Sequence, residues 1–223
     1  YNNRMRVWQD SEPQYTYLIA CDTSLGRDRD YSAFHIINMY NGEQVAEFYS
    51  NRTPINDFAK IIASEGMLYN IAHVVCERNT IGNNLIDWLF NIYEYENLWS
   101  DDKGDLGFQV TAKNRDSILA DLEEAIRTDS IKINSIRTCD ELMTFVMNEQ
   151  GRASAERGYH DDLIMSLALA VHGHKNLIET TFIDYVSKIP HRDAPPMPSK
   201  MYKAQIKTMS GGMTEEDYRW LMK

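Results

Sequence analysis

Cysteine, long apolar runs and basic charge are all scarce in this sequence. The three cysteines among 223 residues, Cys21, Cys76 and Cys139, form no C-x-x-C pair, which argues against zinc and predicts small buried side chains in a reducing compartment. No uncharged apolar window reaches the ~18 residues typical of a membrane span. The first residues, YNNRMRVWQD, lack the apolar stretch of a signal peptide. We therefore expect a soluble, non-secreted globular chain with no membrane partner.

The shortage of basic residues limits how the chain could bind nucleic acid. The sequence has 33 acidic and 23 basic residues, giving a formal net charge of -10. This charge opposes nucleic acid binding through the overall field of the protein, so such a role would need local basic residues or metal ions. The candidates for phosphate contacts are Lys113, Arg115, Lys200 and Lys203. Taken singly, each is more often a solvated surface charge.

Caps, turns and apolar periodicity predict an α/β domain with a mixed central sheet and flanking helices. The expected strands are residues 15–22, 32–40, 43–50, 71–79 and 107–112, and the expected helices are 53–66, 80–95, 114–129, 139–150 and 160–174. Asn41-Gly42 predicts a two-residue type I′ hairpin. Thr53 is expected to cap the first helix, and the spacing from Thr138 to Glu141 predicts a capping box for the fourth.

A change of composition marks the C-terminal part of the chain. Residues 188–207 contain four of the six prolines, and five Lys or Arg against one Asp. Such a segment is typical of a linker or an extended arm. We expect a globular domain at residues 1–187 and a Pro-rich basic arm or extension at residues 188–223.

Carboxylates end two of the expected strands and begin the most apolar helix. Asp22 and Glu77 each follow a cysteine, so alternation would direct both carboxylates to the same face of the sheet. Asp161 and Asp162 fall in a first helical turn. Taken singly, these positions are explained by strand termination and by the helix dipole. Together they predict a site for a hard divalent cation such as Mg²⁺ or Mn²⁺.

The element order and three sequence strings resemble a known nuclease. CDTSLGRDRDYSA, VVCERN and YHDDLIMSLALA are similar to the nuclease domain of the large terminase subunit of T-even-like tailed bacteriophages, which has an RNase H-like fold. The resemblance extends from Tyr17 to about Leu177. It implies a metal-dependent endonuclease that cuts concatemeric viral DNA during headful packaging. Two ions, roughly 3.5–4 Å apart, would be held by Asp22 as the bridging ligand and by Glu77 and Asp161.

The resemblance also implies partners. They are double-stranded DNA, an N-terminal ATPase domain in the parent protein, the portal and the small terminase subunit, in the cytoplasm of the infected bacterium. The sequence contains no G-x-x-x-x-G-K-[ST] string and does not begin with Met. We therefore expect a fragment that carries the nuclease without the motor.

Several residues around the expected site are candidates for further roles. A helical wheel places Asp161 at the margin of the apolar face of its helix and Asp162 nearly opposite, which favours Asp161 as the third ligand and leaves Asp162 as a further candidate. Asp30 and His160 are candidates for orienting the ligands from outside. His172 and His174 are explained by the dipole at a helix C-terminus.

Two other functions remain open at this point. One is a non-catalytic module that grips DNA or docks within a packaging motor. The other is an actin-like ATPase or sugar kinase, because the Asp-Thr-Ser string near Gly26 resembles the start of a phosphate loop. That class needs further glycine-rich loops, which the sequence lacks. Metal-dependent cleavage of plasmid DNA would distinguish the nuclease from both.

Overall fold

The computed structural model describes residues 3–26, 30–101, 103–148 and 151–188, with side chains described as far as residue 177. Lys200 and Lys203 lie outside the described residues, as does the predicted arm beyond Lys188. The division of the chain at residue 188 therefore stays a prediction.

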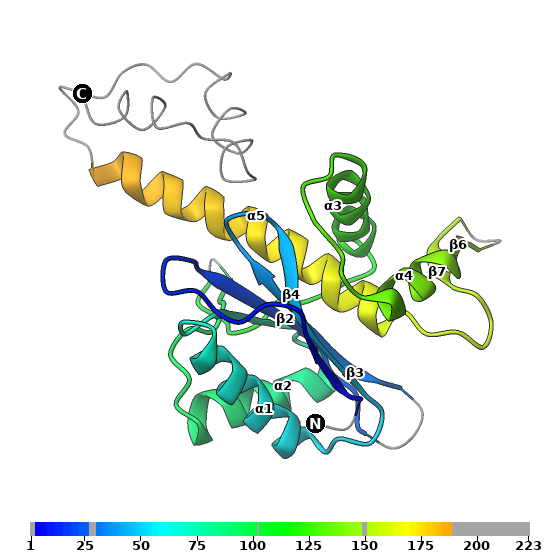
Figure 1. Ribbon diagram of the computed structural model, residues 1–223, viewed down its shortest axis with the longest axis horizontal. Helices are drawn as coiled ribbons and strands as arrows, with labels where there is room; N and C mark the ends of the chain where they lie inside the picture. Colours follow the sequence, from blue (N-terminus) through cyan, green and yellow to red (C-terminus); the bar gives the residue numbers. More distant parts are fainter. Residues whose placement is uncertain (1–2, 27–29, 102, 149–150, 189–223) are drawn as a thin grey trace.

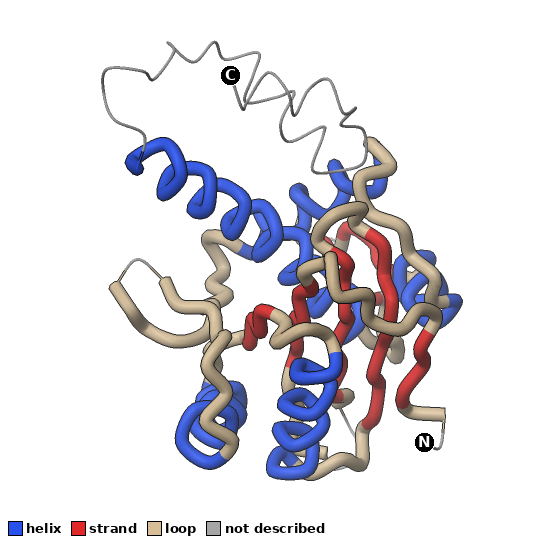
Figure 2. Tube along the Cα trace, turned by 60° about the vertical axis from the view of Figure 1, so that its left-hand side comes forward, coloured by secondary structure: helices blue, strands red, loops and turns tan. Residues whose placement is uncertain are grey.

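A five-stranded mixed sheet forms the centre of the molecule (Figures 1 and 2). Its strands, in spatial order, are β1 (Met5–Val7), β4 (Glu43–Ser50), β3 (Ser32–Asn38), β2 (Tyr17–Asp22) and β5 (His73–Cys76). β2 pairs with β5 in parallel, and the other pairs are antiparallel. The predicted mixed sheet is confirmed, with β2 flanked on both sides.

Helices cover both faces of this sheet (Figure 1). On one face lie α1 (Ile55–Leu68) and α2 (Thr80–Asp87), the latter extended by a π-helical turn, η1 (Trp88–Ile92). On the other lie α3 (Arg115–Arg127) and α5 (Asp162–Lys188), with α4 (Ile136–Met143) against α5. A separate two-stranded sheet pairs β6 (Phe145–Met147) with β7 (Ala153–Ala155). The predicted α/β class with flanking helices is confirmed.

Alternation along β2 divides its side chains between two cores. Ile19 and Cys21 pack with α1 and α2, whereas Leu18 and Ala20 pack with α3 and α5. In β5, Cys76 belongs to the first core and Val75 to the second. The next residues, Asp22 and Glu77, therefore turn toward α5. The expected shared face of the two carboxylates is confirmed.

The hairpin between β3 and β4 differs from the prediction. Asn38 pairs with Glu43, so four residues form the loop, and only Gly42 of the predicted pair has a positive φ, of 69°. A Cβ at Gly42 would lie 2.0 Å from the Ser130 carbonyl oxygen. Glycine is needed here because another backbone segment approaches closely, not because of a type I′ turn.

Helix starts also differ from the capping predictions. α1 begins after Pro54, and the Thr53 hydroxyl donates to Ser50 instead of capping the helix. α4 begins at Ile136, and the Ser135 hydroxyl accepts the Thr138 amide. Thr138 thus lies inside the first turn. The residues after Met143 leave the helix because they pair as β6 with β7.

Three further expectations are corrected. Residues 107–112 form no regular strand; Phe108 makes a single parallel bridge to Glu77, where the positive φ of Gly107 turns the chain. Cys139 is exposed, although Cys21 and Cys76 are buried as predicted. α5 continues to Lys188, well beyond residue 174. No helix in the described ranges is long and apolar enough to cross a membrane.

Candidate metal centre

Two carboxylates meet at one edge of the sheet because β2 and β5 are parallel neighbours. Asp22 is the last residue of β2, and Glu77 directly follows β5. The Glu77 amide donates to the Cys21 carbonyl at 3.2 Å, which keeps the strand ends in register. The two side chains lie close enough for the charge of Glu77 to raise the pKa of Asp22. Adjacent parallel strands thus bring together two acids that are 55 residues apart in the sequence.

The N-terminus of α5 adds two carboxylates to this edge. Asp162 lies on the Asp22 side: its Oδ2 accepts the Tyr31 amide at 3.4 Å and is 3.6 Å from Nδ1 of His160. Asp161 lies on the Glu77 side, where its Oδ2 forms an ion pair with Arg115 at 3.0 Å. The side chain of Asp162 is 15% exposed and that of Asp161 is 36% exposed.

Burial and mutual repulsion make this cluster unfavourable as a set of bare anions. Burial raises the pKa of Asp22 well above its usual range, and the charges of Glu77 and Asp162 raise it further. Burial also raises the pKa of Glu77 and raises that of Asp162 to about 6. An opposite charge at this edge would relieve the repulsion, and the all-oxygen donor set fits Mg²⁺ or Mn²⁺.

The carboxylates do not yet enclose an ion. Within the part of the chain that the structure describes, no three Asp, Glu, His or Cys side chains converge closely enough to hold a metal. Like charges keep such groups apart. Metal binding would therefore require inward movements of these side chains.

The structure gathers most of the residues predicted for the site. The following side chains lie at this edge or act on its charges: Asp22, Glu77, Asp161, Asp162, Asp30, His160 and Arg115. Asp30 is exposed, and His160 packs edge-on against Tyr31 at 4.9 Å. Lys113 is exposed. The metal-binding and DNA-binding roles of these residues stay predictions.

The helical wheel used to choose between Asp161 and Asp162 rests on a premise that the structure does not meet. Every residue from Leu163 to Ala170 is buried, because α5 packs on the sheet with α3 and α4 against it. No single apolar face therefore orients the first turn. The choice of Asp161 stays untested, although the burial of Asp162 beside Asp22 favours the opposite assignment.

The two histidines on α5 have specific partners. Nδ1 of His172 lies 2.8 Å from Asp121 of α3, and Nε2 of His174 lies 2.8 Å from the Met39 carbonyl. Since α5 continues to Lys188, neither residue is at a helix C-terminus, and the dipole explanation is wrong. Both histidines join α5 to neighbouring elements.

Three residues near the site were not predicted from the sequence to belong to it. Glu141 of α4 accepts two amides at the start of α5, and it also accepts the hydroxyl of Tyr49. The ring of Tyr49 stacks on that of Tyr31, with centroids 4.0 Å apart and planes at 4°. No local motif signals these contacts, which join residues far apart in the chain.

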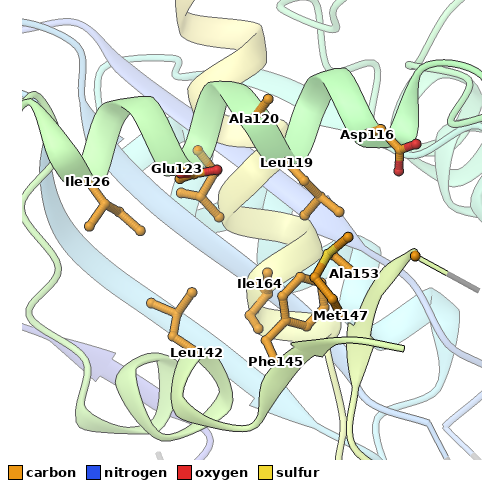
Figure 3. Close-up of a pocket in the computed structure, with 12 residues that line it drawn as sticks. Asp116, Leu119, Ala120, Glu123, Ile126, Leu142, Phe145, Met147, Ala153 and Ile164 are labelled. Atoms are coloured by element: carbon orange, nitrogen blue, oxygen red, sulfur yellow. The ribbon is translucent and has the colours of Figure 1, made fainter. Parts of the chain in front are cut away.

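Two cavities lie beside the helices near the acids. One cavity of about 500 Å³ lies between α3, α4 and the β6–β7 sheet, where Leu119, Leu142 and Phe145 point into it (Figure 3). A second, of about 420 Å³, adjoins Tyr49, Glu141 and His160. Neither is lined by Asp22, Glu77, Asp161 or Asp162. The carboxylates thus occupy a sheet edge and not the interior of these pockets.

Comparison with known proteins identifies the fold. No protein-family model matches the sequence. The large terminase nuclease from thermophilic phage G20c, solved with bound magnesium, is 20% identical with a TM-score of 0.65, and the match covers 77% of this chain and 88% of that one. The same nuclease with bound cobalt is 21% identical with a TM-score of 0.65, over 77% and 88% of the two chains.

A second phage protein gives the same result. The large terminase nuclease domain of Thermus phage P74-26 is 21% identical with a TM-score of 0.61, and the match covers 76% of this chain and 85% of that one. The chain therefore has the RNase H-like fold of large terminase nuclease domains. At these identities the likeness establishes the fold, and the activity has to be argued from the site.

Proposed function

We propose that this chain is a metal-dependent DNA endonuclease, the nuclease domain of a phage large terminase subunit. The observation that carries the proposal is that four carboxylates, from the ends of β2 and β5 and the start of α5, lie along one edge of the sheet. Support comes from the raised pKa values of three of these acids and from the fold shared with terminase nucleases solved with magnesium or cobalt. We propose further that this terminase belongs to the T-even-like group of tailed bacteriophages.

We assign Asp22, Glu77 and Asp162 as the main ligands of two Mg²⁺ or Mn²⁺ ions, with Asp161 at the margin. Asp161 was favoured by the sequence, but its ion pair with Arg115 and its greater exposure argue for a peripheral role. When bound, such ions polarise the scissile phosphate and stabilise the departing 3′-oxygen. His160 and Tyr31 orient Asp162, and Arg115 orients Asp161 while offering positive charge to the DNA backbone.

The substrate in this proposal is double-stranded concatemeric DNA, cut during headful packaging in the cytoplasm of the infected bacterium. Lys113, Arg115, Lys200 and Lys203 are the proposed phosphate contacts. The proposed partners are an ATPase domain, the portal and the small terminase subunit, which would compensate for a net charge of -10.

Cleavage of supercoiled plasmid tests the function directly. We expect the protein to nick and linearise plasmid with little sequence preference in Mg²⁺ or Mn²⁺, and not in EDTA. Raising the salt concentration should slow cutting, because it weakens the basic contacts to phosphate. Equal cutting with and without chelator, or no cutting in any metal, would contradict the proposal.

Arg115 is expected to matter more than other basic residues of its helix. Arg115→Ala removes the ion pair with Asp161 and the 2.6 Å hydrogen bond to the Ala153 carbonyl. We expect cleavage to fall by at least about tenfold, as for other partners of metal ligands. Arg127→Ala, at the exposed far end of α3, is the matched control and should retain full activity. Equal rates for the two variants would remove Arg115 from the site.

A further inference from the structure

The first turn of α5 is capped from outside its own helix. The Met165 amide donates to the Asp161 carbonyl at 2.8 Å, so the amides that precede it have no partner within the helix. Those of Leu163 and Ile164 donate to Oε2 of Glu141, at 2.9 and 3.3 Å. Glu141 belongs to α4, more than 20 residues earlier in the chain. A carboxylate from a neighbouring helix therefore performs the capping.

This arrangement changes what the two aspartates can do. At most helix starts the residue in the position of Asp161 turns its own side chain back to accept the second or third amide. Here Glu141 already accepts these amides, so the Asp161 carboxylate reaches Arg115 and the Asp162 carboxylate reaches the Tyr31 amide. Both side chains are thus directed to the edge where Asp22 and Glu77 end.

Glu141 is itself held on several sides. Its Oε1 accepts the Tyr49 hydroxyl at 2.9 Å, and Tyr49 belongs to β4. α4 is joined to the same strand through Glu47, which is fully buried and accepts Nε of Arg137 and the hydroxyl of Thr138, each at 2.8 Å. The cap therefore connects a central strand with the helix that carries the site.

A second contact fixes the same turn of α5. Nε2 of His35, on β3, lies 2.9 Å from the Leu163 carbonyl, and Nδ1 lies 2.6 Å from the side-chain amide of Gln44. Since a carbonyl only accepts, Nε2 carries the proton and Nδ1 accepts from Gln44. The Leu163 peptide is thus held at its amide by Glu141 and at its carbonyl by His35.

We propose that Glu141 is a positioning residue of the metal centre: by capping α5 from α4, it leaves the Asp161 and Asp162 carboxylates free to bind ions. The inference rests on the proposed function for the nature of the ligand. It predicts that loss of the cap disorders the first turn of α5, so that the Asp162 ligand is no longer held at the site, and lets Asp161 turn back onto its own helix.

Substitutions of Glu141 test this role. Glu141→Ala should weaken Mn²⁺ binding in the absence of DNA and slow plasmid cleavage, each by roughly 10- to 100-fold. Glu141→Gln keeps a carbonyl that accepts both amides, so both measurements should stay within about threefold of the original protein, well below the loss expected for Glu141→Ala. Asp140→Ala is the matched control, because it removes an exposed acid from the neighbouring position of α4. It should change neither measurement.

Hydrogen exchange separates positioning from a general loss of structure. In Glu141→Ala the amides of Leu163 and Ile164 should lose protection, while those of Ala168 and Ala170 keep it. If the alanine variant does not fold, Glu141→Asp replaces it, since the shorter side chain keeps the charge but draws back from the amides. The same losses are then expected.

The outcomes distinguish this inference from the proposed function. Mn²⁺ binding without DNA cleavage by the unsubstituted protein would overturn the proposed function, while the positioning role would still be judged by Mn²⁺ affinity. Unchanged affinity, or unchanged exchange at Leu163 and Ile164 in the capless variants, would overturn the positioning role. Absence of Mn²⁺ binding by the unsubstituted protein would overturn both.

Discussion

Asp22→Asn is expected to reduce metal-dependent DNA cleavage by at least about 100-fold while leaving the fold intact. Asp22 lies between Glu77 and Asp162, so it is the carboxylate best placed to contact two ions at once. Asparagine has nearly the same shape but one neutral oxygen donor, and removal of a group that stabilises charge in a reaction costs on the order of 10²–10³ in rate. Plasmid cleavage in Mn²⁺ measures the effect.

The matched control is Asp57→Asn, an exposed acid on α1, across the sheet from the site. It makes the same chemical change and should cut at the original rate. Glu77→Gln should behave like Asp22→Asn, because Glu77 lies beside Asp22 at the same strand ends and is assigned as a ligand of the same ions. If Asp22→Asn cuts as well as Asp57→Asn, the proposed metal centre is wrong.

The pairing of Asp22 and Glu77 is the part of the site that could be predicted from sequence. A strand has a period of two residues, so a cysteine before each carboxylate was enough to assign a common face. The structure confirms this step, with Cys21 opposite Cys76 in the parallel register, although β5 is an edge strand of the sheet.

The parts that could not be predicted depend on contacts between distant segments. The α5 cap comes from Glu141, and the close approach that requires Gly42 comes from Ser130. Local capping rules assign each helix start to its own neighbouring residues; Thr53 instead donates to Ser50, while α4 is capped by Ser135 and not by the predicted Thr138. Likewise, a helical wheel can orient a residue only where the helix has one buried and one exposed face, and every residue of α5 from Leu163 to Ala170 is buried.

Asp162→Asn is expected to abolish cleavage, whereas Asp161→Asn should retain measurable activity. Asp162 is the more buried of the two and acts on Asp22, while Asp161 is partly satisfied by Arg115. Asp162→Asn removes a carboxylate that we assign as a ligand of the ions. Asp161→Asn removes a charge near the ions but none of their main ligands. The reverse pattern, with a dead Asp161→Asn and an active Asp162→Asn, would restore the assignment made from the sequence.

The thermal stability of the metal-free protein gives an independent measure of the same assignment. Burial raises the pKa of Asp162 to about 6. The folded state therefore holds a proton on this group that the unfolded state releases near pH ~4, so the free energy of unfolding falls as the pH rises from about 4 to 6. Above about pH 6, this difference in pKa lowers the free energy of unfolding by about 3 kcal/mol. Asp162→Asn should recover part of this loss, so its Tm in EDTA at pH 8 should be several degrees higher than that of the unsubstituted protein.

In saturating Mn²⁺ the unsubstituted protein should have a higher Tm than Asp162→Asn, the reverse of the order in EDTA. An ion that binds only the folded state stabilises the unsubstituted protein in proportion to the logarithm of its concentration. Asp162→Asn has lost the ligand and should gain little from the ion. Asp161→Asn should lack the stability gain in EDTA, because it breaks an ion pair with Arg115, and should still respond to Mn²⁺. A residue that destabilises the bare protein and is required for its stabilisation by metal has the two properties expected of a buried carboxylate ligand, and we expect Asp162 alone of this pair to have both.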